Sequence, residues 1–353
     1  MTHEPRSPAT FRHSSVVIES DQSVRQLLVP AVRQALSQSD GVFMAVAAGT
    51  ARLVLAELGP AADTLEWGDT AAFYQRLGFA YEAFRRFLAA AHAAGRRVHV
   101  FAQPDLGLSL SPGPGPGPGL GPDAGPEPAA GAVDRTVAYL AYEAMCNETY
   151  ADYGCEVTCL WDARRHPAAL IDSARALHSH QLGPAGVAPT AGYVSPRQYL
   201  AAQHRQPLPL PAAVDWQARL ADAEGLPALR GELRAWAGGH GYGAAATADV
   251  TLAVNEIATN GLSHGRPPVE VRGWHHGDTL VVQVDDHGGA PLPAAGGYEP
   301  PRRQHERTRG LWLARQLADV MQTHAAGGTT SVRLHFPYQL THQRPPYLAG
   351  PSG

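Results

Sequence analysis

The sequence predicts an α/β protein with two domains of different kinds. In the first half, short apolar runs alternate with stretches of helix formers, which indicates a mostly parallel sheet with helices on both faces. In the second half, two helical stretches precede an alternating hairpin, which indicates an α/β sandwich of helices on a largely antiparallel sheet. A length of 353 residues allows each domain to bury its own core.

The N-terminal domain is predicted from strand and helix signals that follow one another along the chain. An apolar run at 42–47 is followed by a Gly-Thr turn and by helix formers at 51–58, which predicts a strand, a turn and a helix. Residues 71–94 predict a long amphipathic helix that Gly95 terminates. The alternation continues with a strand at 98–101, a helix at 133–151, a strand at 156–161 and a closing segment at 166–177.

Two loop segments set the domain boundaries. Residues 111–130 are nearly all Pro and Gly, so we expect a disordered or extended insertion there. The insertion is placed inside a first domain at 11–185, because residues 133–177 alone hold too few strands for a sheet. Residues 203–213 carry three prolines and no periodicity, which predicts the interdomain linker.

The C-terminal domain, at 226–337, is predicted from helices and an antiparallel hairpin. A helical stretch at 216–223 is expected to lead into it. His276-Gly277-Asp278 is a hairpin turn signal between two alternating strands. The predicted elements are helices at 226–237, 246–263 and 308–321, strands at 269–275, 279–285 and 331–336, and a loose tail at 341–353.

Composition excludes several classes of function. A formal net charge of -4 gives no electrostatic footprint for nucleic acid or for an anionic membrane. Residues 1–10 hold no apolar leader segment, and no stretch reaches the roughly 20 apolar residues that span a bilayer. Three cysteines cannot all pair with one another, which suits a reducing compartment. We therefore expect a cytoplasmic protein with no direct nucleic-acid or membrane partner.

The chain contains no lysine, and all its basic residues other than histidine are arginines. Chemistry that needs a lysine amine is therefore excluded. The excluded classes are Walker A loops, protein-kinase-type folds with their strand lysine, and Schiff-base enzymes.

Glu256 and Asn260 form the first motif. They lie four residues apart in the helix predicted at 246–263, so their side chains point the same way. A carboxylate can accept a proton from an attacking hydroxyl, and a carboxamide oxygen can ligate Mg²⁺. A solvated helix face explains the same pair when it is taken alone. The buried stripe of this helix is expected from Leu252, Ile257, Ala258 and Leu262.

Asp286-His287-Gly288 forms the second motif, at the end of an alternating strand. An ionised Asp there can accept a hydrogen bond from the exocyclic amine of adenine, and the glycine lets the backbone approach a flat ligand. An ordinary Asp/Gly turn is the alternative.

Arg309-Gly310-Leu311 forms the third motif and opens a helix, whose N-terminus is a ready anion site. Simple capping by Thr308 is the alternative. The preceding segment, 290–307, is long for a connection in a compact domain, and such segments are often lids.

Together the three motifs resemble the GHKL family of ATP-binding domains, in particular its anti-sigma-factor serine kinase branch. The resemblance covers residues 226–337 and implies a fold that binds ATP and Mg²⁺. The matching residues are Glu256 and Asn260 in the N box, Asp286 and Gly288 in the G1 box, and Arg309, Gly310 and Leu311 in the G2 region.

The resemblance also implies a role for each residue. Glu256 would be the catalytic base for a protein hydroxyl, Asn260 the Mg²⁺ ligand, and Asp286 the residue that reads adenine. The cofactor-binding set would be Asn260, Asp286, Gly288, Thr308, Arg309, Gly310 and Leu311. Thr308 departs from the family, which usually has glycine there, so the phosphate loop is expected to be stiffer or differently shaped.

The first domain, 11–185, is similar to the MEDS family of sensory domains, which implies a RecA-like core. The loop after Val46 has neither the glycines nor the lysine of a phosphate loop, so we expect a small-ligand or protein signal rather than nucleotide hydrolysis. The matching positions are His13, Ala47-Ala48-Gly49, Tyr142-Glu143, Asn147, Cys159-Leu160-Trp161-Asp162 and His178.

Two further groups have an ordinary structural interpretation. A metal cluster of Cys146, Cys155, Cys159 and His166 lacks any CxxC spacing, so these cysteines are expected to be buried small hydrophobes. His264 is expected to interact with the C-terminal dipole of its helix rather than with phosphate.

These observations predict a signalling regulator in which a sensory domain controls an ATP-dependent serine/threonine kinase. By resemblance, its partner would be an anti-sigma-factor antagonist or a sigma factor. A non-catalytic ATP-dependent binding switch is the alternative, and a histidine kinase is a minor one, since no dimerising helical hairpin precedes the ATP domain. The oligomeric state, a homodimer included, is left open.

Overall fold

The computed structural model describes residues 11–68, 76–104, 135–288, 293, 295–301 and 309–343. The described residues fall into two compact units. The first holds residues up to 196, except that 76–80 and 135–139 group with the second unit, which continues from residue 197 onward. The predicted insertion at 111–130 lies outside the described residues. Among the described residues, no helix combines the length and the apolar character needed to cross a lipid bilayer.

The first unit is built on a seven-stranded sheet with the strand order β3-β2-β4-β5-β1-β6-β7. Neighbouring strands run parallel, except that β6 and β7 form an antiparallel hairpin. The sheet confirms the predicted parallel α/β class. Its strands are β1 (Arg12–Ile18), β2 (Gly41–Ala45), β3 (Glu66–Trp67), β4 (Val98–Ala102), β5 (Glu156–Asp162), β6 (His180–Gly183) and β7 (Gly186–Pro189).

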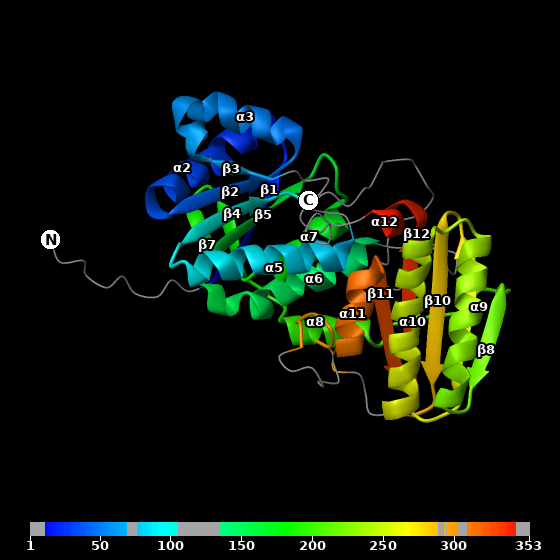
Figure 1. The fold of residues 1–353 in the computed structure, drawn as a ribbon. Helices are drawn as coiled ribbons and strands as arrows, with labels where there is room; N and C mark the ends of the chain where they lie inside the picture. The colour runs from blue at the N-terminus through cyan, green and yellow to red at the C-terminus, as the bar shows by residue number, and fades with distance from the viewer. Residues whose placement is uncertain are drawn as a thin grey trace. The chain divides into compact units, whose positions relative to one another are not determined.

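Helices cover both faces of this sheet, as predicted (Figure 1). Val16 and Ile18 of β1 belong to the apolar core shared with α2 and α3. Because side chains alternate along a strand, His13 lies on the opposite face, where it contacts α6. The helices in this part of the chain are α1 (Asp21–Ser23), α2 (Val29–Gln38), α3 (Ala48–Leu58), α5 (Leu77–Ala93), α6 (Arg135–Thr149) and α7 (Ala168–Leu177).

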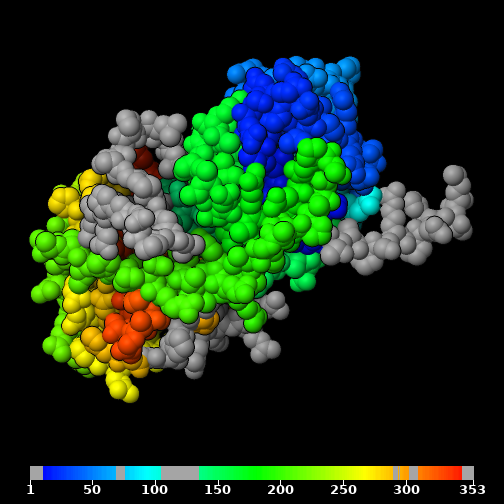
Figure 2. Space-filling model, turned by 180° about the vertical axis from the view of Figure 1, so that it is seen from behind, coloured from blue at the N-terminus to red at the C-terminus, as the bar shows by residue number. Residues whose placement is uncertain are grey.

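The interior strand β1, paired between β5 and β6, is not among the predicted strands. Three of its seven residues, His13, Ser14 and Ser15, are polar yet buried, so its composition does not show the apolar run that marks a buried strand. In Figure 2 the blue surface near the N-terminus adjoins the green surface of much later residues, as the pairing of β1 with β5 and β6 requires.

The second unit is built on a five-stranded antiparallel sheet with the order β11-β12-β10-β9-β8. Two long helices, α9 (Leu226–Gly239) and α10 (Ala244–His264), pack with the shorter α11 (Arg309–Leu317) on one face. This confirms the predicted α/β sandwich. The strands are β8 (Trp216–Leu220), β9 (Val269–His276), β10 (Thr279–Asp286), β11 (Val320–Ala326) and β12 (Thr329–Pro337); α8 (Pro196–Gln203) precedes them and α12 (Tyr338–His342) follows.

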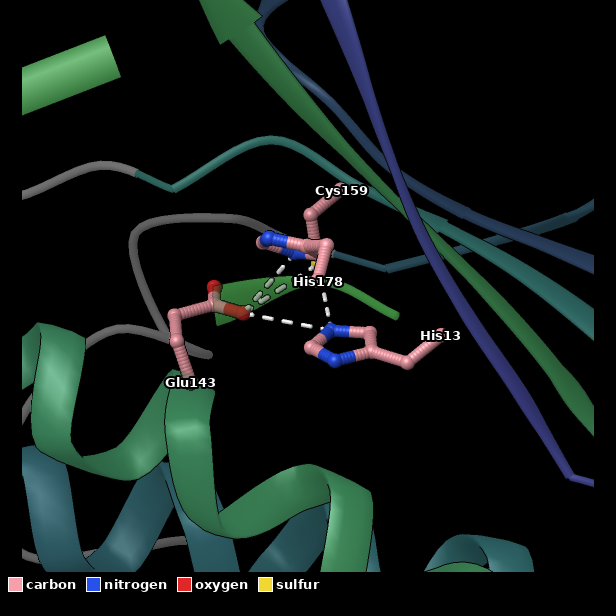
Figure 3. A group of neighbouring side chains, drawn as sticks. All are labelled: His13, Glu143, Cys159 and His178. Atoms are coloured by element: carbon pink, nitrogen blue, oxygen red, sulfur yellow. Dashed lines mark hydrogen bonds and ion pairs between the residues drawn. The ribbon is translucent and has the colours of Figure 1, made fainter. Parts of the chain in front are cut away.

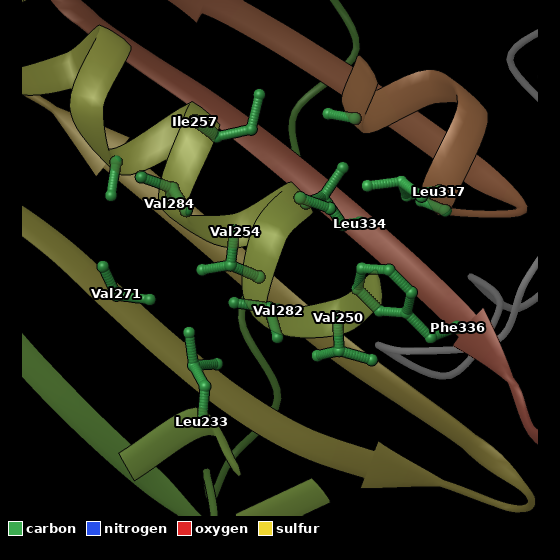
Figure 4. Packing of buried hydrophobic residues seen from close by; sticks show 14 of the residues in the cluster. Leu233, Val250, Val254, Ile257, Val271, Val282, Val284, Leu317, Leu334 and Phe336 are labelled. Carbon is green, nitrogen blue, oxygen red and sulfur yellow. The ribbon is translucent and has the colours of Figure 1, made fainter. Parts of the chain in front are cut away.

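The core of this unit lies between α10 and the sheet. Figure 4 shows Val250, Val254 and Ile257 of α10 pointing toward side chains of β10 and β12. These positions recur every three to four residues, which turns one stripe of the helix to the sheet. Leu252 is off this stripe and 43% exposed, so its predicted burial was wrong.

Two predicted helices were wrong in part. Residues 216–220 form the edge strand β8 instead of a helix, because Trp216, Ala218 and Leu220 alternate inward against β9. The helix predicted at 308–321 ends at Leu317, and the backbone N–H of Asp319 donates to the carbonyl of His335 as β11 begins.

Two segments expected to be loose carry ordered contacts. In the predicted linker, the carbonyl oxygens of His204 and Pro209 accept hydrogen bonds from Ala325 N and from Arg333 Nη2, at 3.1 and 2.6 Å. The first two residues of the predicted tail, Thr341 and His342, belong to α12.

Candidate functional site

Helix α10 positions the first candidate pair. Glu256 and Asn260 lie one turn apart and are both half-buried. The rotation of the helix is set by its apolar stripe and by Asn255, whose Oδ1 accepts a hydrogen bond of 3.0 Å from Arg230 of α9. The carboxylate and the carboxamide therefore stand at the edge of the core, where a ligand can reach them.

The start of α11 lies against this pair. A Cβ atom on Gly310 would lie 3.0 Å from Glu256 Oε2 and 3.0 Å from Asn260 Nδ2. Such contacts are tighter than an ordinary van der Waals approach, so glycine favours a start of α11 this close to α10. Two motifs separated by about fifty residues are thus brought to one place.

Asp286, the last residue of β10, lies against the C-terminal end of α10. A Cβ atom on Gly265 would lie only 2.5 Å from Asp286 Cγ, and one on Gly261 would lie 3.6 Å from Asp286 Cβ. The next residue, His287, donates its backbone N–H to the carbonyl of Arg266 at 3.3 Å. The strand end is therefore anchored beside the helix that carries Asn260.

Gly288 takes a positive φ of 104° directly after this anchored strand end. That backbone conformation favours glycine, and a Cβ there would approach the carbonyl of Gly328 at 3.2 Å. The second motif therefore ends in a bend next to the β11-β12 turn.

The other predicted site residues have different positions. Leu311 is buried in the core, so only its backbone N–H is available to a ligand. Arg309 is exposed at the first position of α11. Thr308 lies outside the described residues. His264 is the last residue of α10, and its interaction with the helix dipole stays a prediction.

Three residues near the site were missed by the sequence reasoning. Gly261 and Gly265 form the surface on which Asp286 rests, and two glycines four apart near a helix end were the available signal. Thr330 of β12 is paired directly with Asp286. Directly opposed residues of antiparallel strands share a face, so Thr330 lies beside Asp286, and no sequence spacing could have shown this.

The residues present fit ATP with Mg²⁺. A carboxamide oxygen and a carboxylate are hard oxygen donors of the kind that Mg²⁺ takes, and Asp286 is an acceptor for an amine. Glycines at 261, 265, 288 and 310 let the segments that carry these residues pack closely against one another. The N-terminus of the nine-residue helix α11 adds backbone N–H donors for an anion.

Replacing Gly265 by Ala should destabilise the second unit by about 1–3 kcal/mol, because the new Cβ would overlap Asp286 and the carbonyl of Gly261. The matched control is Gly231→Ala in the exposed part of α9, where a Cβ meets no atom within 4 Å. That change should stabilise by about 0.5–1 kcal/mol. Urea unfolding of both variants measures the difference, and equal midpoints would contradict the packing of Asp286 on Gly265.

Four residues of the first unit also come together. His13, Glu143, Cys159 and His178 are all buried, and Figure 3 shows them converging from separate elements. Burial, with the neighbouring His178, lowers the pKa of His13 to about 4. Burial alone would raise the pKa of Glu143, but hydrogen bonds with the two histidines bring it well below its usual range. Burial and the charge of Glu143 raise the pKa of the Cys159 thiol.

The cysteines themselves are free and buried, as predicted. Among the described residues, Cys146, Cys155 and His166 are not part of any group of candidate metal ligands. Cys159 lies instead with His13, Glu143 and His178.

The loop after β2 is held to Gln103, whose Oε1 accepts hydrogen bonds from Ala47 N and Thr50 Oγ1 at 3.0 and 2.9 Å.

The fold defines an α/β protein in which a parallel-sheet domain precedes an α/β sandwich of helices on an antiparallel sheet. Comparison with known families agrees. Residues 220–336 match the histidine kinase-like ATPase domain, and residues 12–179 match MEDS, the MEthanogen/methylotroph, DcmR Sensory domain. The chain therefore carries a MEDS sensory domain followed by a histidine kinase-like ATPase domain.

Comparisons with individual proteins add little. No curated protein matches the sequence significantly. A crystal structure of the RsbU and RsbW domains of a Mycobacterium tuberculosis protein is similar at 19% identity, covering 36% of this chain and 32% of that chain with a TM-score of 0.26. The chain thus matches about a third of that structure, and a TM-score this low supports no conclusion about function.

Proposed function

We propose that this protein is a signalling regulator that binds ATP and Mg²⁺ in its C-terminal domain and phosphorylates a serine or threonine of a partner protein. The observation that carries the proposal is the position of Gly310, where an added Cβ would lie 3.0 Å from both Glu256 Oε2 and Asn260 Nδ2. A proton acceptor and a metal ligand thereby stand together at the N-terminus of α11. The N-terminal MEDS domain would control this activity in response to a signal.

Each residue of the site has one task in this proposal. Bound ATP supplies the phosphoryl group that is transferred. Glu256 accepts the proton of the partner hydroxyl as that oxygen attacks. Asn260 holds Mg²⁺ through its carboxamide oxygen, and Asp286 accepts a hydrogen bond from the adenine amine. These roles come from the family resemblance, and the positions of the side chains support them.

The partner class rests on the resemblance of the motifs to anti-sigma-factor serine kinases. We propose an anti-sigma-factor antagonist as the phosphorylated protein, with a sigma factor as a second protein bound by the same domain.

A non-catalytic switch is the second candidate. Thr308 stands where the family usually has glycine, and a β-branched residue restricts the backbone. ATP would then change only the affinity for the partner, without phosphate transfer.

Labelled ATP distinguishes the two functions. The full chain is incubated with ATP labelled on the γ-phosphate and with candidate antagonist proteins, each paired with a version whose acceptor serine is alanine. The kinase proposal predicts label on the serine protein and none on its alanine version. ATP binding with no transfer to any antagonist would leave only the switch.

A further inference from the structure

The four converging side chains of the first unit come from four separate elements (Figure 3). His13 is on β1, Glu143 on α6 and Cys159 on β5, and His178 directly follows α7. Each side chain is at most 4% exposed. One nitrogen, oxygen or sulfur atom from each residue lies within 4.8 Å of every other. Four donor atoms therefore surround one buried point.

Four of the six distances between these atoms are close to the edges of a tetrahedral metal site. His13 Nε2 and His178 Nε2 lie 3.2 and 3.3 Å from Glu143 Oε2. Cys159 Sγ lies 3.4 Å from His13 Nε2 and 3.5 Å from Glu143 Oε2. Metal–ligand bonds of about 2.0–2.3 Å at tetrahedral angles place neighbouring ligand atoms about 3.3–3.7 Å apart.

The tautomer of His178 leaves its inward nitrogen ready to bind a metal. Its Nδ1 is 2.7 Å from the carbonyl oxygen of Ala174, so Nδ1 must carry the hydrogen and donate it. Nε2 then faces the cluster, 3.3 Å from Glu143 Oε2, and in the neutral ring it offers its lone pair to a metal. Metal-bound histidines commonly donate their other N–H to a carbonyl in this way.

Asn147 positions this histidine from α6. Its Nδ2 donates to the carbonyl oxygen of Leu177, the residue before His178, at 2.9 Å. The same helix supplies Glu143. Helix α6 therefore carries one donor, Glu143, and through Asn147 it also fixes the backbone next to a second donor, His178. A binding site needs such support to hold its ligand atoms in place.

We propose that His13, Glu143, Cys159 and His178 bind one divalent transition-metal ion, with zinc as the best fit. Two imidazole nitrogens, a carboxylate oxygen and a thiolate sulfur are the mixed donor set that zinc takes, whereas Mg²⁺ and Ca²⁺ take oxygen. Binding replaces the thiol proton of Cys159, and the proton leaves to solvent. The charges of the thiolate and the carboxylate then balance the ion, which makes a neutral buried site.

The site has four protein ligands, so a tetrahedral ion would be fully coordinated and would hold no reactive water. It would act by joining β1, β5, α6 and the end of α7. Metal occupancy would thereby set the stability of the sensory domain. This site is independent of the function proposed for the ATPase domain.

Metal binding by the full-length protein tests the proposal. The chain is stripped with a chelator and titrated with Zn²⁺, and separately with Co²⁺, whose visible spectrum reports tetrahedral geometry and thiolate bonding. We expect one ion per chain, a thiolate-to-cobalt band, and a higher unfolding temperature when zinc is bound. If the wild-type protein takes up neither ion, the proposal is overturned. This test does not depend on any variant.

Matched variants locate the ion. Cys159→Ser should remove the cobalt–thiolate band and weaken zinc binding by more than the 10- to 100-fold typical of an outer-shell loss. Cys155→Ser, at another buried free cysteine, should change neither the cobalt–thiolate band nor the zinc affinity. His240→Ala tests the exposed group of Asp215, His240 and His275. This change should also leave the cobalt–thiolate band and the zinc affinity as in the wild type. If Cys155→Ser or His240→Ala abolishes binding while Cys159→Ser does not, the assignment is wrong.

Discussion

Replacing Glu256 by Gln should lower phosphate transfer to the partner by about 10²- to 10⁴-fold, the range that a positioned base contributes. Glutamine keeps the size and the position of the side chain beside Gly310 but cannot accept the proton of the attacking hydroxyl. ATP affinity should hold or rise, because a negative charge is removed near the phosphates. Initial rates of transfer from labelled ATP measure the first effect, and calorimetric titration measures the second.

The control for this variant is Glu232→Gln. Glu232 is exposed on α9, so the same change of charge is made away from the site, and transfer should stay at the wild-type rate. If Glu256→Gln transfers phosphate as fast as the wild type, Glu256 is not the base.

Replacing Asp286 by Asn should weaken ATP binding by about 10- to 100-fold. A hydrogen bond to a charged group is worth about 1.5–3 kcal/mol, and the amide that replaces the carboxylate presents a donor to the adenine amine as well as an acceptor. The preference for ATP over GTP should also fall, because guanine carries a carbonyl where adenine carries the amine. Competitive titration with both nucleotides measures the two effects together.

Asp278→Asn is the matched control. Asp278 lies in the hairpin turn at the other end of β10 and is exposed, so neither affinity should change. An Asp286→Asn chain with wild-type affinity and wild-type nucleotide preference would remove Asp286 from the adenine site.

Much of the C-terminal domain could be predicted because its signals are local. The spacing of Glu256 and Asn260 on a helix and the turn at Gly277 between alternating strands both depend on neighbouring residues. The structure adds what spacing cannot show. The approach of Gly310 to α10 and the packing of Asp286 on Gly265 are tertiary contacts.

The errors in this domain have local causes as well. Residues 216–220 hold helix formers, but their partner β9 makes them an edge strand, and tertiary pairing overrides propensity there. The apolar character of Leu252 predicts a core residue, but the helix turns this side chain toward solvent.

The N-terminal domain was less predictable because its key residues are far apart. His13 and Cys159 share a face through the parallel register that pairs Ser15 with Cys159. Glu143 approaches from α6, and His178 is the residue after α7. The resemblance to the MEDS family marks His13, Glu143, Cys159 and His178 one by one in the sequence. The fold brings them into one cluster.

The most direct test of the account is a calorimetric titration of ATP into the wild-type chain, with and without Mg²⁺. The account predicts saturable binding of one ATP per chain, with a lower affinity when Mg²⁺ is removed, because Asn260 acts through the metal. A chain that binds no ATP, or that binds it equally well in the absence of Mg²⁺, would contradict the nucleotide site described around Glu256, Asn260 and Asp286.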